Sequence, residues 1–101
     1  MRFRIKDFTT KVGSGGTPRG GAEVYQNSGI PLFRSQNVTD DGFLLDDIAY
    51  ISPKIDEEMS GSRIKPNDVL LNITGASIGR CYYVPADFNH GNVNQHVCII
   101  R

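Results

Sequence analysis

Hydrophobic and polar positions are most clearly ordered between residues 68 and 80. Residues 69–73 read Val-Leu-Leu-Asn-Ile, a nearly continuous apolar run that is typical of a strand buried on both faces. Gly75 and Gly79 bracket the next three residues, and glycine adopts the positive φ angles that tight turns require. The pattern predicts a strand, a glycine-bounded turn and the start of a second strand.

The rest of the pattern predicts short elements separated by turns. Charged and apolar residues alternate over residues 1–12, which indicates a strand, with a short helix over residues 5–8 as the alternative. Glycine and proline then interrupt regular structure over residues 13–18. Further elements are expected as a helical turn at 22–27, extended stretches at 29–34, 43–51 and 80–84, and a last strand at 93–100.

One helix has clear boundary signals. Ser52 is a good N-terminal cap, and Pro53 fits the first helical position. The acidic residues 56–58 fall in the early turns, where the helix dipole favours negative charge. Gly61 is a typical terminator, so the helix is expected over about residues 53–60.

The chain has 101 residues, which is the length of one small domain, and its formal net charge is zero. Zero net charge argues against a general polyanion binder. The charges are segregated, however: residues 1–21 hold five basic side chains and one acidic, a net +4, while residues 39–58 hold seven acidic and one basic, a net −6. A polyanion would approach the first region and avoid the second, unless both are ordinary solvated surface.

Cys81 and Cys98 each lie in an apolar run, where a free cysteine behaves as a small buried hydrophobe. Their spacing is not that of a zinc site, and the sequence shows no secretory signal and no membrane span. We therefore expect a reduced, cytoplasmic setting without membrane contact.

Candidate catalytic and metal-binding patterns are weak. His90 and His96 have no serine, cysteine or carboxylate at an interpretable spacing, although catalytic geometry is not read directly from sequence. The aspartates at 40, 41, 46 and 47 lack the spacing of a calcium loop. We expect a non-catalytic chain that holds no metal and no cofactor.

Amide side chains gather at the ends of expected strands, namely Gln36, Asn37, Asn72, Asn92, Asn94 and Gln95. Asparagine and glutamine can bind the N6/N7 edge of adenine with two hydrogen bonds, and arginine can bind the O6/N7 edge of guanine. Arg34 and Arg80 lie close to these amides in the sequence. The alternative is that the amides satisfy backbone groups in the loops.

Four blocks of the chain together resemble one known family. They are Ser14-Gly15-Gly16-Thr17-Pro18, Gly29–Val38 (GIPLFRSQNV), Ser62–Arg80 (SRIKPNDVLLNITGASIGR) and Asn92–Val97 (NVNQHV). In this order they resemble the target recognition domain of the specificity subunit of type I restriction–modification systems. Each block alone is a weak motif, whereas the ordered set is specific and spans nearly the whole chain.

The resemblance implies sequence-specific, non-catalytic binding of duplex DNA, in which one domain reads one half of a split target. It also implies partners: methyltransferase subunits, which use S-adenosylmethionine to methylate adenine, and a restriction subunit. The fold implied by the resemblance is α/β (α+β), with a curved, barrel-like, mostly antiparallel sheet and one or two short helices.

The resemblance covers about the first half to two thirds of such a domain, because family members continue into further strands and a spacer helix beyond the position of Arg101. We therefore expect residues 1–101 to form a single, partial domain. If the last strand lies at a sheet edge, that edge could pair with another chain, so self-association is a further expectation. The sequence does not give the DNA target.

The resemblance and the residue chemistry together give the candidate site. Phosphate contacts, which position a protein without reading sequence, are assigned to Lys11, Ser14, Gly15, Gly16, Thr17 and Arg19. Base-edge contacts in the major groove are assigned to Arg34, Gln36 and Asn37. The remaining candidates either contact DNA or hold the reading loops: Ser35, Asn72, Thr74, Ser77, Arg80, Asn94 and Gln95. For Asn72 and Thr74 we favour the second role.

The alternative to DNA binding is a function in protein–protein interaction. In this alternative the chain is a protein-interaction module that associates with a methyltransferase or another specificity chain and does not touch DNA. Zero net charge and the acidic region 39–58 favour it.

Overall fold

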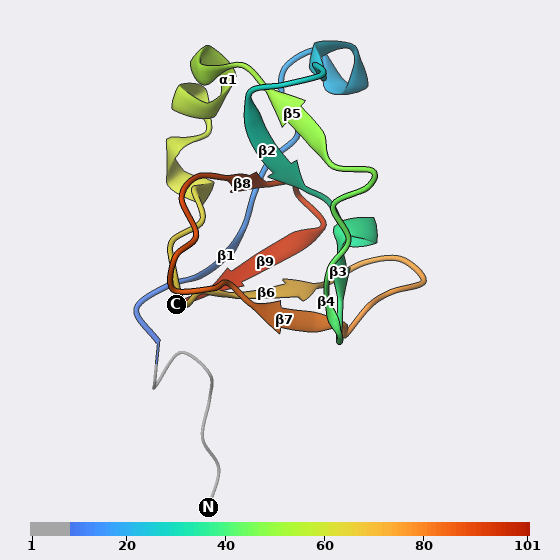
Figure 1. The fold of residues 1–101 in the computed structure, drawn as a ribbon, viewed down its shortest axis with the longest axis vertical. Helices are drawn as coiled ribbons and strands as arrows, with labels where there is room; N and C mark the ends of the chain where they lie inside the picture. Colours follow the sequence, from blue (N-terminus) through green and yellow to red (C-terminus); the bar gives the residue numbers. More distant parts are fainter. Residues whose placement is uncertain (1–8) are drawn as a thin grey trace, which may run out of the picture.

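The computed structural model describes residues 9–101, apart from the side chain of Ala22. The strand or helix expected within residues 1–8 lies outside this range. The described chain folds into short strands, one α-helix and several 3₁₀ helices (Figure 1). The strands are β1 (Val12–Ser14), β2 (Ile30–Phe33), β3 (Val38–Thr39), β4 (Gly42–Phe43), β5 (Ala49–Ile51), β6 (Val69–Asn72), β7 (Cys81–Tyr83), β8 (Asn92–Val93) and β9 (Val97–Ile100). The helices are α1 (Pro53–Glu58) and the 3₁₀ helices η2 (Gly21–Val24), η3 (Ser35–Asn37) and η4 (Ser60–Ser62).

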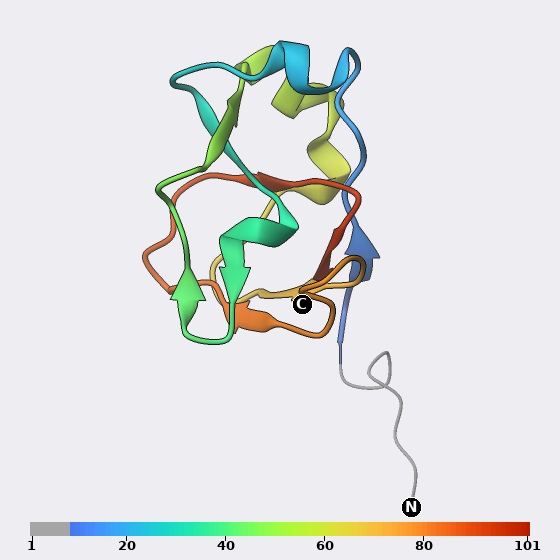
Figure 2. The same cartoon turned by 90° about the vertical axis from the view of Figure 1, so that its right-hand side faces the viewer.

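The strands form three sheets. The largest has four antiparallel strands in the order β1-β9-β6-β7, and a second has the order β5-β2-β8. Strand β2 runs antiparallel to β5 and parallel to β8, while β3 and β4 form a separate hairpin. The hairpin stands beside β7, where the Cys81 N–H donates to Asp40 Oδ1 over 3.1 Å (Figure 2). The fold is thus mixed α/β and mostly antiparallel, as expected, but the sheets are not closed into a barrel.

The last stretch of the chain differs from the expected single strand over residues 93–100. It is divided into β8 and β9, which belong to two different sheets. Asn94 makes the turn between them, because its Oδ1 accepts from the His96 N–H over 3.0 Å and its own N–H donates to the Phe33 carbonyl over 3.1 Å. The prediction of one strand was wrong because this turn depends on a partner far away in the sequence.

Strand β9 is also not an edge strand. It lies between β1 and β6, with Ile100 opposite Val12 and Ile99 opposite Leu70. Within the described chain, the outer strands of this sheet are β1 and β7. Self-association through an open sheet edge stays a prediction, but β9 would not supply that edge.

The core has two parts. The larger is built around Phe33, Leu70, Val93 and Ile99, and the smaller around the β2–β5 pair. In β6 only alternate residues are buried, namely Leu70 and Asn72, while Val69 and Leu71 are half-buried. The expected burial on both faces was therefore wrong, because the second face of the four-stranded sheet is only partly covered.

The two cysteines differ in burial. Cys98 in β9 is buried, and burial raises the pKa of its thiol. Cys81 in β7 is exposed, so its expected burial was wrong; β7 turns Cys81 and Tyr83 to solvent. Within residues 9–101, no helix has the length and apolar character needed to cross a membrane.

Helix α1 begins as predicted. The Ser52 hydroxyl accepts from the Ile55 N–H over 3.2 Å, and Pro53 occupies the first turn. The helix ends two residues earlier than expected, because the chain tightens into η4 before Gly61.

Asp56 is not the solvated acid that its place in the first turn of α1 suggested. It is almost fully buried, and its Oδ1 accepts from Asn92 Nδ2 over 2.9 Å. Its Oδ2 accepts from Arg63 Nε over 3.0 Å and lies 3.3 Å from His90 Nε2. Burial by itself raises the pKa of the Asp56 carboxyl, but the hydrogen bonds from Asn92, His90 and Arg63, together with the charge of Arg63, outweigh it, so that this pKa lies below its usual 3.8. The ionised carboxylate thus joins α1 to β8.

This arrangement predicts a pH-dependent contribution to stability. Because the pKa of Asp56 is lower in the folded chain than in the unfolded chain, its contribution is present above the usual value of 3.8 and is lost as the pH falls through the folded-state pKa. Asp56→Asn should lower the free energy of unfolding by about 1–3 kcal/mol at neutral pH and flatten its acid dependence, as measured by urea denaturation across pH.

The exposed Asp87 provides a matched control. Asp87→Asn should leave both the stability and its pH dependence nearly unchanged. Equal effects of the two substitutions would show that the buried hydrogen bonds of Asp56 do not contribute in this way.

Candidate functional site

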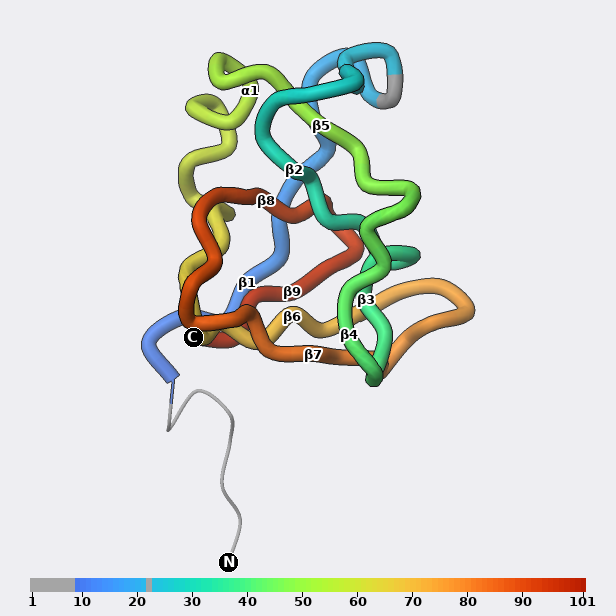
Figure 3. The backbone as a smooth tube through the Cα atoms, viewed as in Figure 1, coloured from blue at the N-terminus to red at the C-terminus, as the bar shows by residue number. Residues whose placement is uncertain are grey.

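The loop of residues 73–80, between β6 and β7, projects from the body of the molecule (Figure 3). Gly75 and Gly79 have φ angles of 80° and 91°, the left-handed region that glycine adopts without strain. The Gly79 N–H donates to the Asn72 carbonyl and the Asn72 N–H donates to the Arg80 carbonyl, both over 2.9 Å. The predicted glycine-bounded turn is therefore present and closed at its base by backbone hydrogen bonds.

The side chain of Asn72 fixes this loop to a distant part of the chain. It is 1% exposed, and its Nδ2 lies 2.9 Å from the Ser35 carbonyl, 3.2 Å from the Val38 carbonyl and 3.1 Å from Ser77 Oγ. Burying an amide is costly unless it is hydrogen-bonded, so these contacts hold the loop against η3 and β3. Asn72 is part of the framework and presents no amide to solvent.

Asn37, the last residue of η3, is also held by hydrogen bonds within the protein. Its Oδ1 accepts from the Arg34 N–H over 2.9 Å, and its Nδ2 donates to the Leu44 carbonyl over 2.9 Å. The residue is fully buried. The amide that was assigned to a base edge is thus engaged within the protein.

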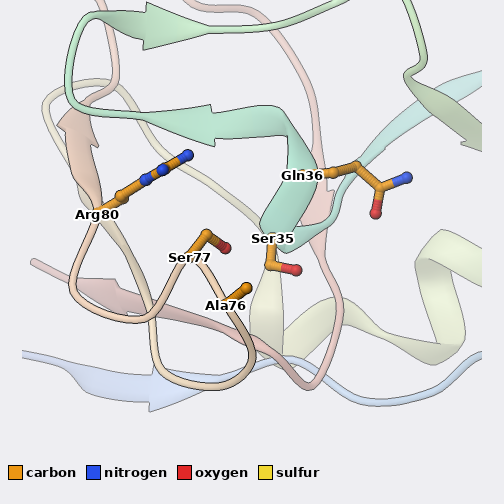
Figure 4. Close-up of a pocket in the computed structure, with 5 residues that line it drawn as sticks. All are labelled: Ser35, Gln36, Ala76, Ser77 and Arg80. Atoms are coloured by element: carbon orange, nitrogen blue, oxygen red, sulfur yellow. The ribbon is translucent and has the colours of Figure 1, made fainter.

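The loop and η3 enclose a shallow depression of about 400 Å³, lined by Ser35, Gln36, Ala76, Ser77 and Arg80. Figure 4 shows Ser35 close to Ala76 and Ser77 of the loop, while the Gln36 side chain points away from them. Four of the five lining residues were candidates from the sequence. Two segments separated by about forty residues are thus brought together at this point.

Arg34 is held inside the protein rather than presented at the depression. Its Nη2 donates to the Asp47 carbonyl over 2.6 Å and lies 3.6 Å from Asp47 Oδ2. Its guanidinium also lies 5.4 Å from the centre of the Tyr25 ring. Gln36 Nε2 donates to Asp47 Oδ2 over 3.0 Å. Both side chains assigned to base edges are therefore bound to the loop that precedes β5.

Arg80 differs from Arg34. Its side chain is exposed, and no hydrogen bond or ion pair within residues 9–101 holds the guanidinium. It also lines a second depression, of about 470 Å³, together with Thr39, Asp40, Asp41 and Leu44. Arg80 is therefore available to a ligand, but two aspartates lie nearby.

A second turn contacts the base of the 73–80 loop. The Ile73 N–H donates to the His96 carbonyl over 3.1 Å, and Thr74 Oγ1 lies 2.6 Å from His96 Nδ1. Asn94 is buried and makes the turn described above, whereas Gln95 is exposed. The structure thus brings Thr74 and Gln95 to exposed positions beside the loop and places Asn94 in the framework.

The glycine loop lies in a separate depression of about 390 Å³, lined by Ser14, Gly15, Gly16, Thr17, Glu58, Met59, Gly61 and Ser62. The Gly15 N–H donates to the Asn94 carbonyl over 3.1 Å, and a Cβ on Gly15 would overlap the Val93 carbonyl oxygen. Gly15 is therefore needed for close backbone packing, which the sequence did not distinguish from phosphate binding. The carboxylate of Glu58 beside the loop is unfavourable for a phosphate.

The other assigned phosphate contacts are dispersed. Lys11 is half-buried next to β1, and its carbonyl accepts from the Arg101 N–H over 2.9 Å. Arg19 is exposed after Pro18. Neither residue lines the depression at the 73–80 loop.

Sequence reasoning missed Ala76 and Ile78 as candidate site residues. Ile78 is 65% exposed at the end of the loop. The sequence signal that could have identified Ile78 is its position as a large apolar residue in a turn bounded by two glycines. Among residues 9–101, no group of three or more His, Cys, Asp or Glu side chains is arranged to hold a metal ion.

Comparison of the chain with protein-family models and with curated proteins gives no match.

The packing of the glycine loop gives a direct prediction. Gly15→Ala should lower the free energy of unfolding by about 1–3 kcal/mol, because the added Cβ meets the backbone of β8. Gly16→Ala is the matched control, since no atom lies within 4 Å of a Cβ at that position. Chemical denaturation measures both, and equal stabilities for the two variants would contradict the close approach of Gly15 to Val93.

Proposed function

We propose that the chain is a specificity module that binds duplex DNA with a sequence preference. The module would read one half of a bipartite target in a type I restriction–modification system. The observation that carries the proposal is the meeting of Ser35, Ser77 and Arg80 at one depression, beside a loop fixed by buried Asn72. The resemblance of four ordered sequence blocks supports the same function.

The exposed groups around the loop have the chemistry for such contacts. The guanidinium of Arg80, which has no partner within residues 9–101, can donate to phosphate oxygens or to the O6/N7 edge of guanine. The side chains of Thr74 and Gln95 are exposed nearby, where both can form hydrogen bonds. The buried amides of Asn37, Asn72 and Asn94 would hold these groups in place instead of reading bases.

In this proposal the chain itself catalyses no reaction. Methylation of adenine would be carried out by methyltransferase subunits that bind S-adenosylmethionine, and cleavage by a restriction subunit, all in the cytoplasm. Lys11 and Arg19 would add weaker contacts to phosphates, which fix orientation without reading sequence.

One observation favours the protein-interaction alternative. Leu44 and Leu45 are 55% and 58% exposed, and aspartates at 40, 41, 46 and 47 flank them. An acidic surface with exposed leucines repels DNA and suits a basic, partly apolar protein surface. The salt dependence of binding distinguishes the two functions, because DNA binding weakens steeply with salt whereas an apolar interface does not.

The proposal predicts how Arg80 acts. Arg80→Gln should weaken binding to duplex DNA by up to about eightfold at 0.1 M salt and reduce the slope of log K against log salt by about 1, as expected for one lost phosphate contact. Fluorescence anisotropy with labelled duplexes over a salt series measures both quantities.

Lys54→Gln is the control, because Lys54 is an exposed cation of equal charge on α1, on the opposite side of the molecule from the loop (Figure 1). It should leave the slope unchanged. Equal effects of the two substitutions would mean that only overall charge matters, and the absence of binding to any duplex would favour the protein-interaction function.

A further inference from the structure

The end of the 73–80 loop presents an apolar side chain to solvent. Ile78 is 65% exposed, which is the highest value among the exposed large hydrophobic side chains of residues 9–101. A single exposed apolar residue is common in proteins and needs no explanation by itself. Ile78 differs in two respects: hydrogen bonds fix the loop backbone around it, and hydrogen-bond donors lie beside it.

Hydrogen bonds of Ile78 and of its two neighbours fix the backbone at this position. Its own N–H donates to the Gly75 carbonyl over 3.2 Å, and the next residue, Gly79, donates to the Asn72 carbonyl over 2.9 Å. Its preceding neighbour, Ser77, is bound through Oγ to buried Asn72. A loop with hydrogen bonds on both sides of one residue presents that residue at little further cost in conformational entropy when a ligand binds.

The polar groups beside Ile78 are donors. Ser77 Oγ accepts the hydrogen bond from Asn72 Nδ2, so this bond does not use the hydroxyl hydrogen of Ser77, which a ligand acceptor can take. Arg80, two residues after Ile78, has only N–H donors, and its guanidinium is without a partner within the described chain. The loop therefore presents Ile78, and to a lesser extent Ile73 at 37% exposed, together with hydrogen-bond donors, and residues 73–80 contain no amide or carboxylate side chain.

Only one base matches this combination in the major groove. Thymine presents a hydrogen-bond acceptor, O4, next to an apolar C5-methyl group. Guanine presents acceptors without a methyl group, and adenine and cytosine each present an amino donor. We infer that Ile78 contacts the C5-methyl group of a thymine in the bound duplex, while O4 of that thymine accepts from Ser77 or Arg80. This inference rests on the proposed function and specifies which base the loop reads.

The test removes the methyl group from the DNA. Duplexes retained by the chain from a random pool are amplified with either thymidine or deoxyuridine triphosphate, which differ only in the C5-methyl group. The wild-type chain should bind the deoxyuridine duplexes about fourfold more weakly, the factor expected for one buried methyl-sized group. Ile78→Ala should bind thymidine duplexes about as weakly as the wild type binds deoxyuridine duplexes, and should no longer distinguish the two.

Val12→Ala is the control, since Val12 is a half-exposed apolar residue in β1. This variant should keep the wild-type preference for thymidine.

The possible outcomes distinguish failure of the inference from failure of the proposed function. Equal wild-type affinity for both duplexes, or a thymidine preference that survives in Ile78→Ala, would overturn the inference while DNA binding stands. Loss of affinity in Ile78→Ala without any thymidine preference would assign Ile78 to a wedge between base pairs and also overturn it. Failure of the wild-type chain to retain any duplex would overturn the proposed function and the inference with it.

Discussion

The buried amide of Asn72 is the contact on which the candidate interface depends. A polar side chain at the end of a core strand is stable only if its hydrogen-bonding groups find partners inside the protein. Asn72 meets this requirement through its Nδ2, which contacts two carbonyls near η3 and the Ser77 hydroxyl, whereas its buried Oδ1 has no hydrogen-bond partner within residues 9–101. Because the same side chain contacts both segments, the strand end, the loop and η3 are held in one arrangement.

The same constraint recurs elsewhere in the fold. Asn37 joins η3 to the segment that follows β4, and Asn92 joins β8 to the buried carboxylate of Asp56. Strands of two to four residues supply few backbone hydrogen bonds, so side chains complete the connections between sheets. The side chains left for a ligand are then those that the framework does not use, chiefly Arg80, Ile78 and the hydroxyl hydrogen of Ser77.

The local features of the fold could be predicted from the sequence because they depend on neighbouring residues. The Ser52 cap, the glycine turn at Gly75 and Gly79 and the strand at 69–72 all follow from short patterns. The division of residues 93–100 could not, since it depends on a hydrogen bond from Asn94 to Phe33.

The candidate site was predicted only in part, for the same reason. Sequence reasoning identified amides and arginines as polar groups of the right chemistry, but it could not tell buried ones from exposed ones. Arg34 and Arg80 show the difference: the first is bound to Asp47, and the second is free within the described chain. Asp56 shows the reverse case, in which an apparently solvated acid is buried.

The measurement that tests the central claim most directly is selection from a random duplex DNA library with the purified chain, carried out at low and at moderate salt. If the fixed loop reads bases, a short sequence motif should be enriched, and the same motif should persist at the higher salt concentration. Recovery of no duplex, or of duplexes without a common motif that are lost as salt rises, would contradict direct base reading by this chain.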